Sequence, residues 1–359
     1  MKIKTEKSTY REVMARERNE RKKPVRPNIL FRSLIYILSQ PSMRKTHFSV
    51  REKGMEKLGK KEPCLVLMNH SSFIDLKIAS TLLYPRPFNI ICEADGFVGK
   101  EWLMRQIGCI PTHKFVSETA LVKDMMYTVR TLKSSILLYP EASYSFDGTS
   151  PTPLPESLGK CIKLLKVPVV MIRTYGAFQR DPLYNLLKLR NVDVSADMEY
   201  LLSPEEIASL TSDDINSLVS SRFSFDHFQW QKENGIEVKE NFRTDGLCSV
   251  LYKCPKCGKE GVMESGGEEI WCSSCGKKWR MEEDGSLKAM DGDDIFSSVP
   301  EWSRWERKET EKEIDRGEYK VDVPVEILMH VDYSAIYDIG KGRLVHSTEG
   351  FHLTSDDGE

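Results

Sequence analysis

Short apolar runs alternate with stretches of helical periodicity over the middle of the chain. Residues 64–68, 88–92, 135–139 and 167–172 are the strand candidates. Helix candidates at 73–83, 118–133 and 158–166 lie between them, with apolar residues spaced to share one face. Strands that alternate with helices predict an α/β domain with a largely buried sheet, over about residues 54–243. Binding and catalytic residues in such domains lie where strands end and helices begin.

The N-terminal segment, residues 1–53, shows a different pattern. It holds 15 Lys and Arg against 5 Glu, although the whole chain carries a net charge of only −2. Residues 28–40 read as a short amphipathic helix that Pro41 closes, and the residues spaced to share its apolar face are Ile29, Leu30, Leu34, Ile37 and Leu38. A basic flank beside such a helix is typical of an interfacial membrane anchor. A helix packed on the main domain, preceded by a solvated tail, explains the pattern equally well.

Hydropathy excludes some classes of protein. The 359 residues have a mean hydropathy of −0.42, and no stretch reaches the roughly 18 uninterrupted apolar residues of a membrane span. This excludes a polytopic membrane protein. The charged N-terminus does not resemble a secretory signal. We therefore expect a cytoplasmic protein that is peripheral on the inner face of the membrane.

The first strand–helix junction, residues 69–75 (NHSSFID), places an aspartate five residues after a histidine. As a bare pattern this is weak, because His352 and Asp357 match it in the polar C-terminal tail. Residues five apart on one helix face different ways, so His70 and Asp75 meet only if His70 precedes the helix and Asp75 lies in its first turns. Asp75 would then fix the imidazole tautomer and leave the other ring nitrogen free to accept a proton.

The second junction, residues 139–143 (YPEAS), follows another strand, which Pro140 ends and beyond which Glu141 projects. Together the two junctions resemble the glycerolipid acyltransferase family, which includes the lysophosphatidate and glycerol-phosphate acyltransferases. In that family a strand precedes Asn-His, four residues and Asp, and a later strand precedes an aromatic residue and Pro-Glu-Gly-Thr-Arg. The resemblance covers about residues 55–180. It implies an α/β fold with a mixed sheet flanked by helices.

The resemblance also implies a reaction and roles for the matching residues. It implies that His70, Asp75 and Glu141 are the catalytic residues, and that His70, oriented by Asp75, would deprotonate an acceptor hydroxyl. That hydroxyl would attack the thioester of acyl-CoA or acyl carrier protein, the acceptor being a glycerolipid such as lysophosphatidate. We expect these residues to bind substrate: Asn69, Lys114, Pro140, Ser143 and Arg173. The chain departs from the family at Ala142, Ser143 and Tyr144, which stand where the family has Gly, Thr and Arg.

Four of the nine cysteines form two CxxC knuckles with the spacing of a zinc ribbon: Cys254, Cys257, Cys272 and Cys275. Four thiolates leave no open coordination position, so we predict a structural Zn²⁺, with an iron or redox site as the alternative. Residues 254–280 carry a surplus of only one positive charge, so we expect no nucleic-acid partner. A ribbon that recruits a partner to a non-catalytic lipid- or carrier-protein-binding adaptor is the alternative function.

The C-terminal segment, residues 291–359, is predicted to contain a charged helix over residues 302–317. Every second residue from 321 to 333 is apolar, which predicts a strand, and residues 340–342 (GKG) read as a hairpin turn before another strand. We thus expect a basic N-terminal arm at 1–53, an acyltransferase-like domain at 54–243, a zinc ribbon at 244–290, and a helix with β-rich segment at 291–359.

Overall fold

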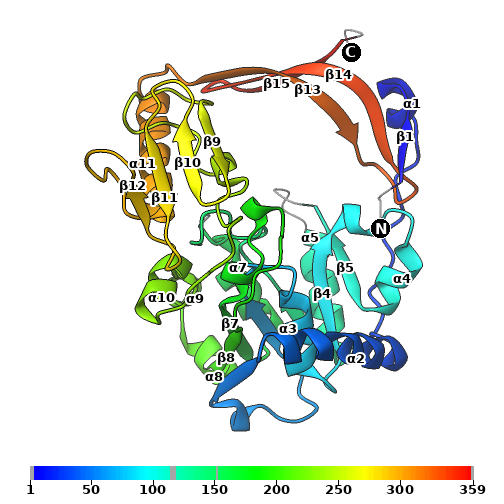
Figure 1. The fold of residues 1–359 in the computed structure, drawn as a ribbon. Helices are drawn as coiled ribbons and strands as arrows, with labels where there is room; N and C mark the ends of the chain where they lie inside the picture. The colour runs from blue at the N-terminus through cyan, green and yellow to red at the C-terminus, as the bar shows by residue number, and fades with distance from the viewer. Residues whose placement is uncertain (1–3, 114–118, 151–152, 357–359) are drawn as a thin grey trace.

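A seven-stranded sheet forms the centre of the protein in the computed structural model, which describes residues 4–113, 119–150 and 153–356 (Figure 1). The strand order is β2-β8-β7-β3-β6-β4-β5. Adjacent strands are parallel except for the antiparallel pair β7–β8. The predicted α/β domain with a mixed sheet is therefore confirmed. The strands are β2 (Ser49–Lys53), β3 (Leu65–Met68), β4 (Phe88–Glu93), β5 (Cys109–Thr112), β6 (Ser135–Leu138), β7 (Val169–Tyr175) and β8 (Ser195–Leu202).

Helices cover both faces of this sheet because the side chains of its central strands alternate between two apolar cores. In β3, Val66 and Met68 belong to the core beneath α3, whereas Leu65 and Leu67 belong to the core beneath α5, α6 and α9. The helices around the sheet are α2 (Ile29–Lys45), α3 (Asp75–Leu83), α4 (Glu101–Gln106), α5 (Thr119–Arg130), α6 (Ser157–Leu165), α7 (Ala177–Arg180), α8 (Pro204–Ser209), α9 (Ser212–Phe223) and α10 (His227–Glu233).

Helix α2 extends beyond the predicted end at Pro41 and reaches Lys45. A proline removes one N–H donor from the helix, and here the side of α2 that packs on the domain continues past it, with Ser39 and Met43 buried. The predicted apolar face points the other way. Leu30 is 76% exposed and Leu38 is 64% exposed, and Leu34 and Ile37 are exposed between them. None of the described helices is long and apolar enough to cross a bilayer.

A second sheet surrounds the cysteine knuckles. It is antiparallel, in the order β12-β11-β10-β9, and consists of β9 (Met263–Gly266), β10 (Glu269–Cys272), β11 (Lys278–Met281) and β12 (Leu287–Ala289). The fully buried Trp279 packs against Trp302 with a ring-centroid distance of 4.7 Å. Trp302 belongs to α11 (Val299–Asp315), which matches the predicted charged helix.

The third sheet joins the two ends of the chain. It contains β13 (Lys320–Met329), β14 (Ile336–Ser347) and β15 (Gly350–Ser355), and β1 (Thr5–Lys7) pairs in parallel with β14. In Figure 1 these long strands arch from α11 to the N-terminal α1 (Tyr10–Met14). The arch contacts the central domain where the N–H of Gly99 donates to the carbonyl of Tyr333 at 2.8 Å.

The predicted hairpin turn at 340–342 is wrong, because these residues lie inside β14. Gly342 sits where strands approach closely: a Cβ there would come within 2.3 Å of the Thr354 carbonyl oxygen. Gly342 is therefore needed because the neighbouring strand passes close to its backbone, and the chain does not reverse direction there.

Candidate active site and candidate metal centre

His70 and Glu141 meet because their strands are neighbours. Strands β3 and β6 are parallel, with Leu67 opposite Leu138, so the residues that follow them emerge at the same edge of the sheet. The backbone N–H of His70 donates to Glu141 Oε2 at 2.9 Å. The two predicted junctions therefore form one cluster.

Asp75 organises the loop between β3 and α3. Its Oδ2 accepts hydrogen bonds from His70 Nδ1 at 3.0 Å and from the backbone N–H groups of Ser71 and Ser72 at 2.7 and 3.0 Å. Helix α3 begins at Asp75 itself, so His70 precedes the helix as the spacing predicted. Asp75 is fully buried, and these three donors partly compensate its charge at Oδ2, whereas its Oδ1 has no hydrogen-bond partner among the described residues. The contact assigns the proton of His70 to Nδ1 and leaves Nε2 as the acceptor.

Two tyrosine rings cover the two faces of the His70 imidazole. The centroid of Tyr139 lies 4.1 Å from that of His70 and the centroid of Tyr144 lies 3.8 Å away. Phe73 extends the stack beyond Tyr144 at 5.8 Å and is 61% exposed. Only 20% of the His70 side chain is exposed. The open approach to the imidazole therefore lies in the plane of the ring, at the Nε2 edge.

Burial keeps both tyrosines neutral. It raises the pKa of Tyr144 to about 12, and it raises the pKa of Tyr139 well above its usual value. Neither hydroxyl ionises near neutral pH, so these rings act as stacking partners rather than as bases.

Glu141 supports the loop instead of touching the imidazole. Its carboxylate accepts from the His70 backbone and from the Ser150 hydroxyl, and only 5% of the residue is exposed. Burial raises its pKa, and the hydrogen bonds from Ser150 and His70 oppose that shift. Glu141 therefore holds the backbone of His70 in place, and its catalytic role stays a prediction.

Two of the residues predicted to bind substrate, Asn69 and Arg173, line one small polar cavity with Glu141. Asn69 is buried and links strand ends: its Oδ1 accepts from the Thr174 N–H at 2.8 Å. Pro140 is buried, whereas Ser143 is exposed on the same loop. Arg173 also lies over the Phe225 ring at 5.4 Å. Lys114 lies outside the described residues.

Asp181 and His227 complete the loop's support, and the sequence analysis missed both. The Ser72 hydroxyl donates to Asp181 Oδ1, which also accepts from Arg180 Nη1 at 2.8 Å. Nε2 of the buried His227 lies 3.3 Å from Ser71 Oγ. Asp181 directly follows the short helix α7 and His227 is the first residue of α10, so no strand-end pattern in the sequence marks either residue.

Backbone amides near His70 differ in their availability. Those of His70, Ser71 and Ser72 are taken by Glu141 and Asp75. The amides of Phe73, Ser143 and Tyr144 make no hydrogen bond within the described ranges. The turn that precedes Ser143 and Tyr144 is strained, because Ala142 adopts the left-handed conformation at φ 58°.

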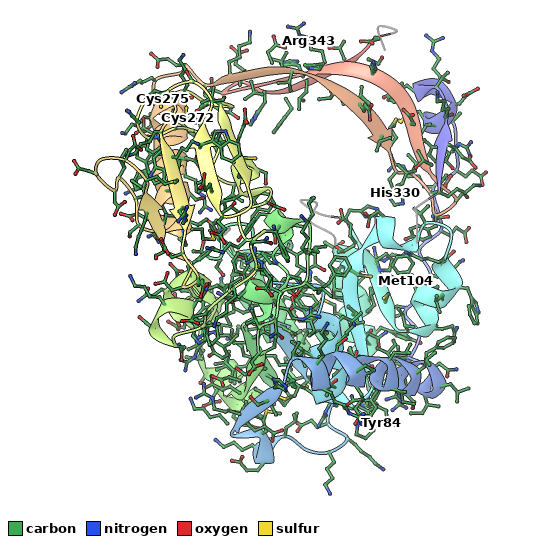
Figure 2. All side chains as sticks on the ribbon, viewed as in Figure 1. Tyr84, Met104, Cys272, Cys275, His330 and Arg343 are labelled. Carbon is green, nitrogen blue, oxygen red and sulfur yellow. The ribbon has the colours of Figure 1, made fainter. Side chains whose placement is uncertain are left out.

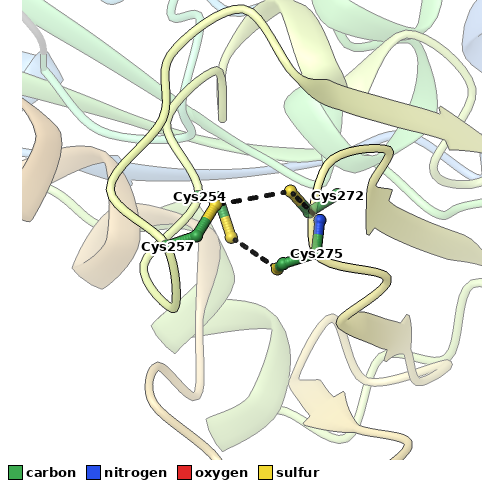
Figure 3. A group of neighbouring side chains, drawn as sticks. All are labelled: Cys254, Cys257, Cys272 and Cys275. Carbon is green, nitrogen blue, oxygen red and sulfur yellow. Dashed lines mark hydrogen bonds between the residues drawn. The ribbon is translucent and has the colours of Figure 1, made fainter.

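The four knuckle cysteines form a second cluster (Figure 3). Their sulfur atoms all lie within 4.8 Å of one another, with Cys254 Sγ 3.7 Å from Cys275 Sγ and Cys257 Sγ 3.8 Å from Cys272 Sγ. Four sulfurs at about 2.3 Å from a central Zn²⁺ in a tetrahedron are about 3.8 Å apart. The donor set and its dimensions therefore fit a closed tetrahedral zinc site.

The thiols of this cluster differ in their surroundings. A backbone hydrogen bond from Lys259 lowers the pKa of Cys257 to about 7, whereas burial raises the pKa of Cys254 to about 12. The other five cysteines lie apart from the cluster: Cys64, Cys92, Cys109, Cys161 and Cys248. Cys64 and Cys109 are buried and the remaining three are partly buried, which is typical of cysteines that act as small apolar side chains.

One part of this chain is similar to known proteins. The structure is similar to that of the 1-acyl-sn-glycerophosphate (LPA) acyltransferase PlsC from Thermotoga maritima, with 14% sequence identity and a TM-score of 0.43 over 54% of this chain and 76% of that protein. No curated protein matches the chain by sequence. Residues 49–174, which contain His70, Asp75, Glu141 and Arg173, match the family model described as Acyltransferase, so this stretch is similar to that family.

Proposed function

We propose that the protein is an O-acyltransferase, similar to the 1-acylglycerol-3-phosphate O-acyltransferases. It moves a fatty acyl group from acyl-CoA or acyl carrier protein to a hydroxyl of a glycerolipid such as lysophosphatidate, a step of phospholipid biosynthesis. One observation carries the proposal: His70 Nδ1 lies 3.0 Å from the buried Asp75, which leaves Nε2 free for the acceptor hydroxyl at the edge where the strands end. The acyltransferase family match over residues 49–174 supports it.

In this mechanism Nε2 of His70 takes the proton of the acceptor hydroxyl as its oxygen attacks the thioester carbonyl. The carbon–sulfur bond then breaks, the departing sulfur receives the proton from His70, and the products are an ester and a free thiol. A positioned general base is typically worth about 10² to 10⁴ in rate. Asp75 stabilises the imidazolium that forms during this transfer.

The developing oxyanion needs donors that the loop has not already used. The free amides of Phe73, Ser143 and Tyr144 are the candidates, because the amides of the preceding loop bind Asp75 and Glu141. In this proposal Ser143 contacts the substrate through its exposed loop. Arg173 and Lys114 are the cations that would hold an anionic group of the acceptor.

The exposed face of α2 supports attachment to a membrane surface. Leu30, Leu34, Ile37 and Leu38 form a contiguous apolar stripe on the side of the helix opposite its buried residues Ser39 and Met43. The preceding segment is strongly basic, which favours the anionic inner leaflet. We therefore propose a cytoplasmic protein that is peripheral on the inner face of the membrane.

The cysteine cluster would hold a structural zinc ion. Cys254, Cys257, Cys272 and Cys275 would occupy all four tetrahedral positions, and the bound metal would stabilise the small sheet around them. In this proposal residues 54–243 carry the chemistry. Residues 244–290 form the ribbon, residues 291–359 and 1–53 form accessory segments, and nucleic acid is not a partner.

The activity is tested by incubating the full chain with acyl-CoA or acyl carrier protein and a panel of lysolipids. Mass spectrometry of the lipids should show an acylated product with at least one acceptor, together with release of the donor thiol. The His70→Ala variant should form product about 10² to 10⁴ times more slowly. Absence of product with every donor and acceptor would contradict the proposed reaction.

Membrane attachment is tested separately by co-sedimentation with vesicles of phosphatidylcholine and phosphatidylglycerol. We expect Leu30→Ser, Leu34→Ser and Ile37→Ser together to remove most of the binding, because burial of each leucine or isoleucine contributes about 2 kcal/mol. The matched control replaces three exposed leucines elsewhere, Leu164, Leu189 and Leu353, with serine. Undiminished binding by the α2 variant would contradict attachment through this helix.

A further inference from the structure

A second polar site lies at the edge of the central sheet opposite His70. It is a groove of about 870 Å³ lined by Pro63, Pro87 and Ser135, which lie at or just before the first residues of β3, β4 and β6. His70 and Glu141 follow the last residues of β3 and β6, so the groove and the candidate active site occupy opposite ends of the same strands.

The groove is strongly basic. Five cations line it, Arg26, Lys60, Lys61, Arg86 and Lys133, against the two carboxylates of Glu52 and Glu62. Within the described part of the chain, Lys60, Lys61 and Lys133 form no ion pair. The Arg86 guanidinium donates to the backbone carbonyls of Glu62 and Gly59, so its charge is not neutralised either.

The floor of the groove is apolar. Leu58, Leu83 and Met198 are buried beneath it, and Met55 and Leu82 add further hydrocarbon surface. Cations around an apolar floor complement an amphiphile whose anionic head carries a hydrocarbon chain. Lysine and arginine together suit a phosphate ester, arginine as a planar donor and lysine as a point charge.

The groove adjoins the exposed apolar helix α2. Tyr84 forms part of its wall and stacks on Tyr36 of α2 with a ring-centroid distance of 4.4 Å, and its hydroxyl lies 3.2 Å from Ser33 Oγ. Figure 2 shows Tyr84 beside α2, at the end of the molecule opposite Arg343 on the arch. Arg26 of the groove precedes the first residue of α2 by three positions. A lipid surface that contacts α2 therefore lies close to the groove.

We infer that this groove binds the phosphate ester of an anionic amphiphile, as in a phospholipid headgroup with the start of its acyl chains. The inference does not depend on acyl transfer, because the groove shares no residue with the His70 cluster. Inorganic phosphate presents the same anionic oxygens as the lipid headgroup but has no acyl chain. An experiment with both ligands therefore distinguishes a phospholipid from free phosphate.

The test is calorimetric titration of the full chain with short-chain phosphatidylglycerol below its micelle concentration. Replacing Lys60, Lys61 and Lys133 with glutamine should weaken binding at least tenfold, since each nearby cation contributes about fivefold toward an anionic lipid. The control variant carries Lys160→Gln, Lys256→Gln and Lys288→Gln, which remove the same charge away from the groove and should bind like wild type. Equal affinity in the two variants would overturn the inference.

Inorganic phosphate is the second probe. We expect it to bind at least tenfold more weakly than the short-chain lipid, because the apolar floor contributes nothing to its affinity. If inorganic phosphate binds as tightly as the lipid, the assignment to an amphiphile is overturned.

Discussion

The four cysteines come from two knuckles of one short stretch, whereas the groups that hold His70 come from distant parts of the chain. Asp75 begins the helix directly after the His70 loop, but Glu141 follows β6, Asp181 follows α7 and His227 begins α10. Backbone N–H groups of the two knuckles donate to the sulfurs of Cys254, Cys257 and Cys272, and a metal would supply the bond common to all four cysteines. The His70 loop is instead fixed by many hydrogen bonds.

This difference predicts how each site fails. A site that depends on one ion loses its organisation when a single ligand is removed. A loop that several independent groups support should lose activity gradually as each support is removed, and only His70 itself should be indispensable. The following predictions test that contrast.

The largest expected effect is at the cysteine cluster. Cys272 is fully buried, so Cys272→Ser should abolish stoichiometric zinc binding and unfold the sheet β9–β12. Metal analysis of the purified protein and hydrogen exchange of that sheet measure both losses. Cys161→Ser, which changes a partly buried cysteine outside the cluster, should leave the zinc content unchanged. Full zinc content in Cys272→Ser would contradict the four-cysteine site.

The next effect concerns the aromatic cover of His70. Tyr144→Ala should lower kcat about tenfold, because an aromatic stacking pair is worth about 0.5–1.5 kcal/mol and its loss frees the imidazole to tilt. Tyr144→Phe keeps the stack and should retain most activity. Steady-state thiol release compares the three proteins. If Tyr144→Phe lowers kcat as much as Tyr144→Ala does, the hydroxyl of Tyr144 rather than its ring supports activity.

Because of His227, the free energy of unfolding should depend on pH. Burial lowers its pKa from 6.5 to about 3, so the unfolded chain binds a proton in this range that the folded chain does not. The free energy of unfolding should therefore fall as pH falls from 6.5 toward 3, by up to about 1.4 kcal/mol per pH unit. Urea unfolding measures this free energy at each pH, and its slope against pH should be shallower in His227→Gln than in the wild type. The exposed His352→Gln control should keep the wild-type slope, and an unchanged slope in both would argue against a neutral buried His227.

The smallest expected effect is at the turn after Glu141. Ala142 holds a left-handed conformation that costs an L-residue about 1 kcal/mol, so Ala142→Gly should stabilise the protein by somewhat less than that. Ala177→Gly, in a right-handed helix, should destabilise it instead. Chemical denaturation measures both. A destabilised Ala142→Gly protein would show that the turn is not strained.

The elements that the sequence predicted best are those whose signal is local. The strands Leu65–Met68 and Ser135–Leu138 are short apolar runs. That they are neighbours in the sheet was only a condition of the prediction, because β4 and β5 lie between them in the sequence. The pairing of His70 with Asp75 needed only the five-residue spacing and a helix start. The two strands and this pairing each depend on a few consecutive residues.

Other features depended on contacts that no local pattern reveals. The spacing identified the apolar face of α2 but not its direction, because periodicity says which residues share a face and not what they touch. Pro41 and Gly342 were read by their usual local roles, yet packing of Met43 and the close approach of Thr354 determined the structure there. His227 reaches Ser71 only through tertiary folding.

The most direct test of the account is a double-mutant cycle on His70 and Asp75, read as kcat/KM for thiol release with the acceptor that gives product. If Asp75 acts by orienting His70, His70→Ala should lose about 10² to 10⁴ in rate and the double variant with Asp75→Asn should lose no more. Circular dichroism should show each variant folded. Losses that multiply in the double variant, or near wild-type activity in His70→Ala, would contradict a general base formed by this pair.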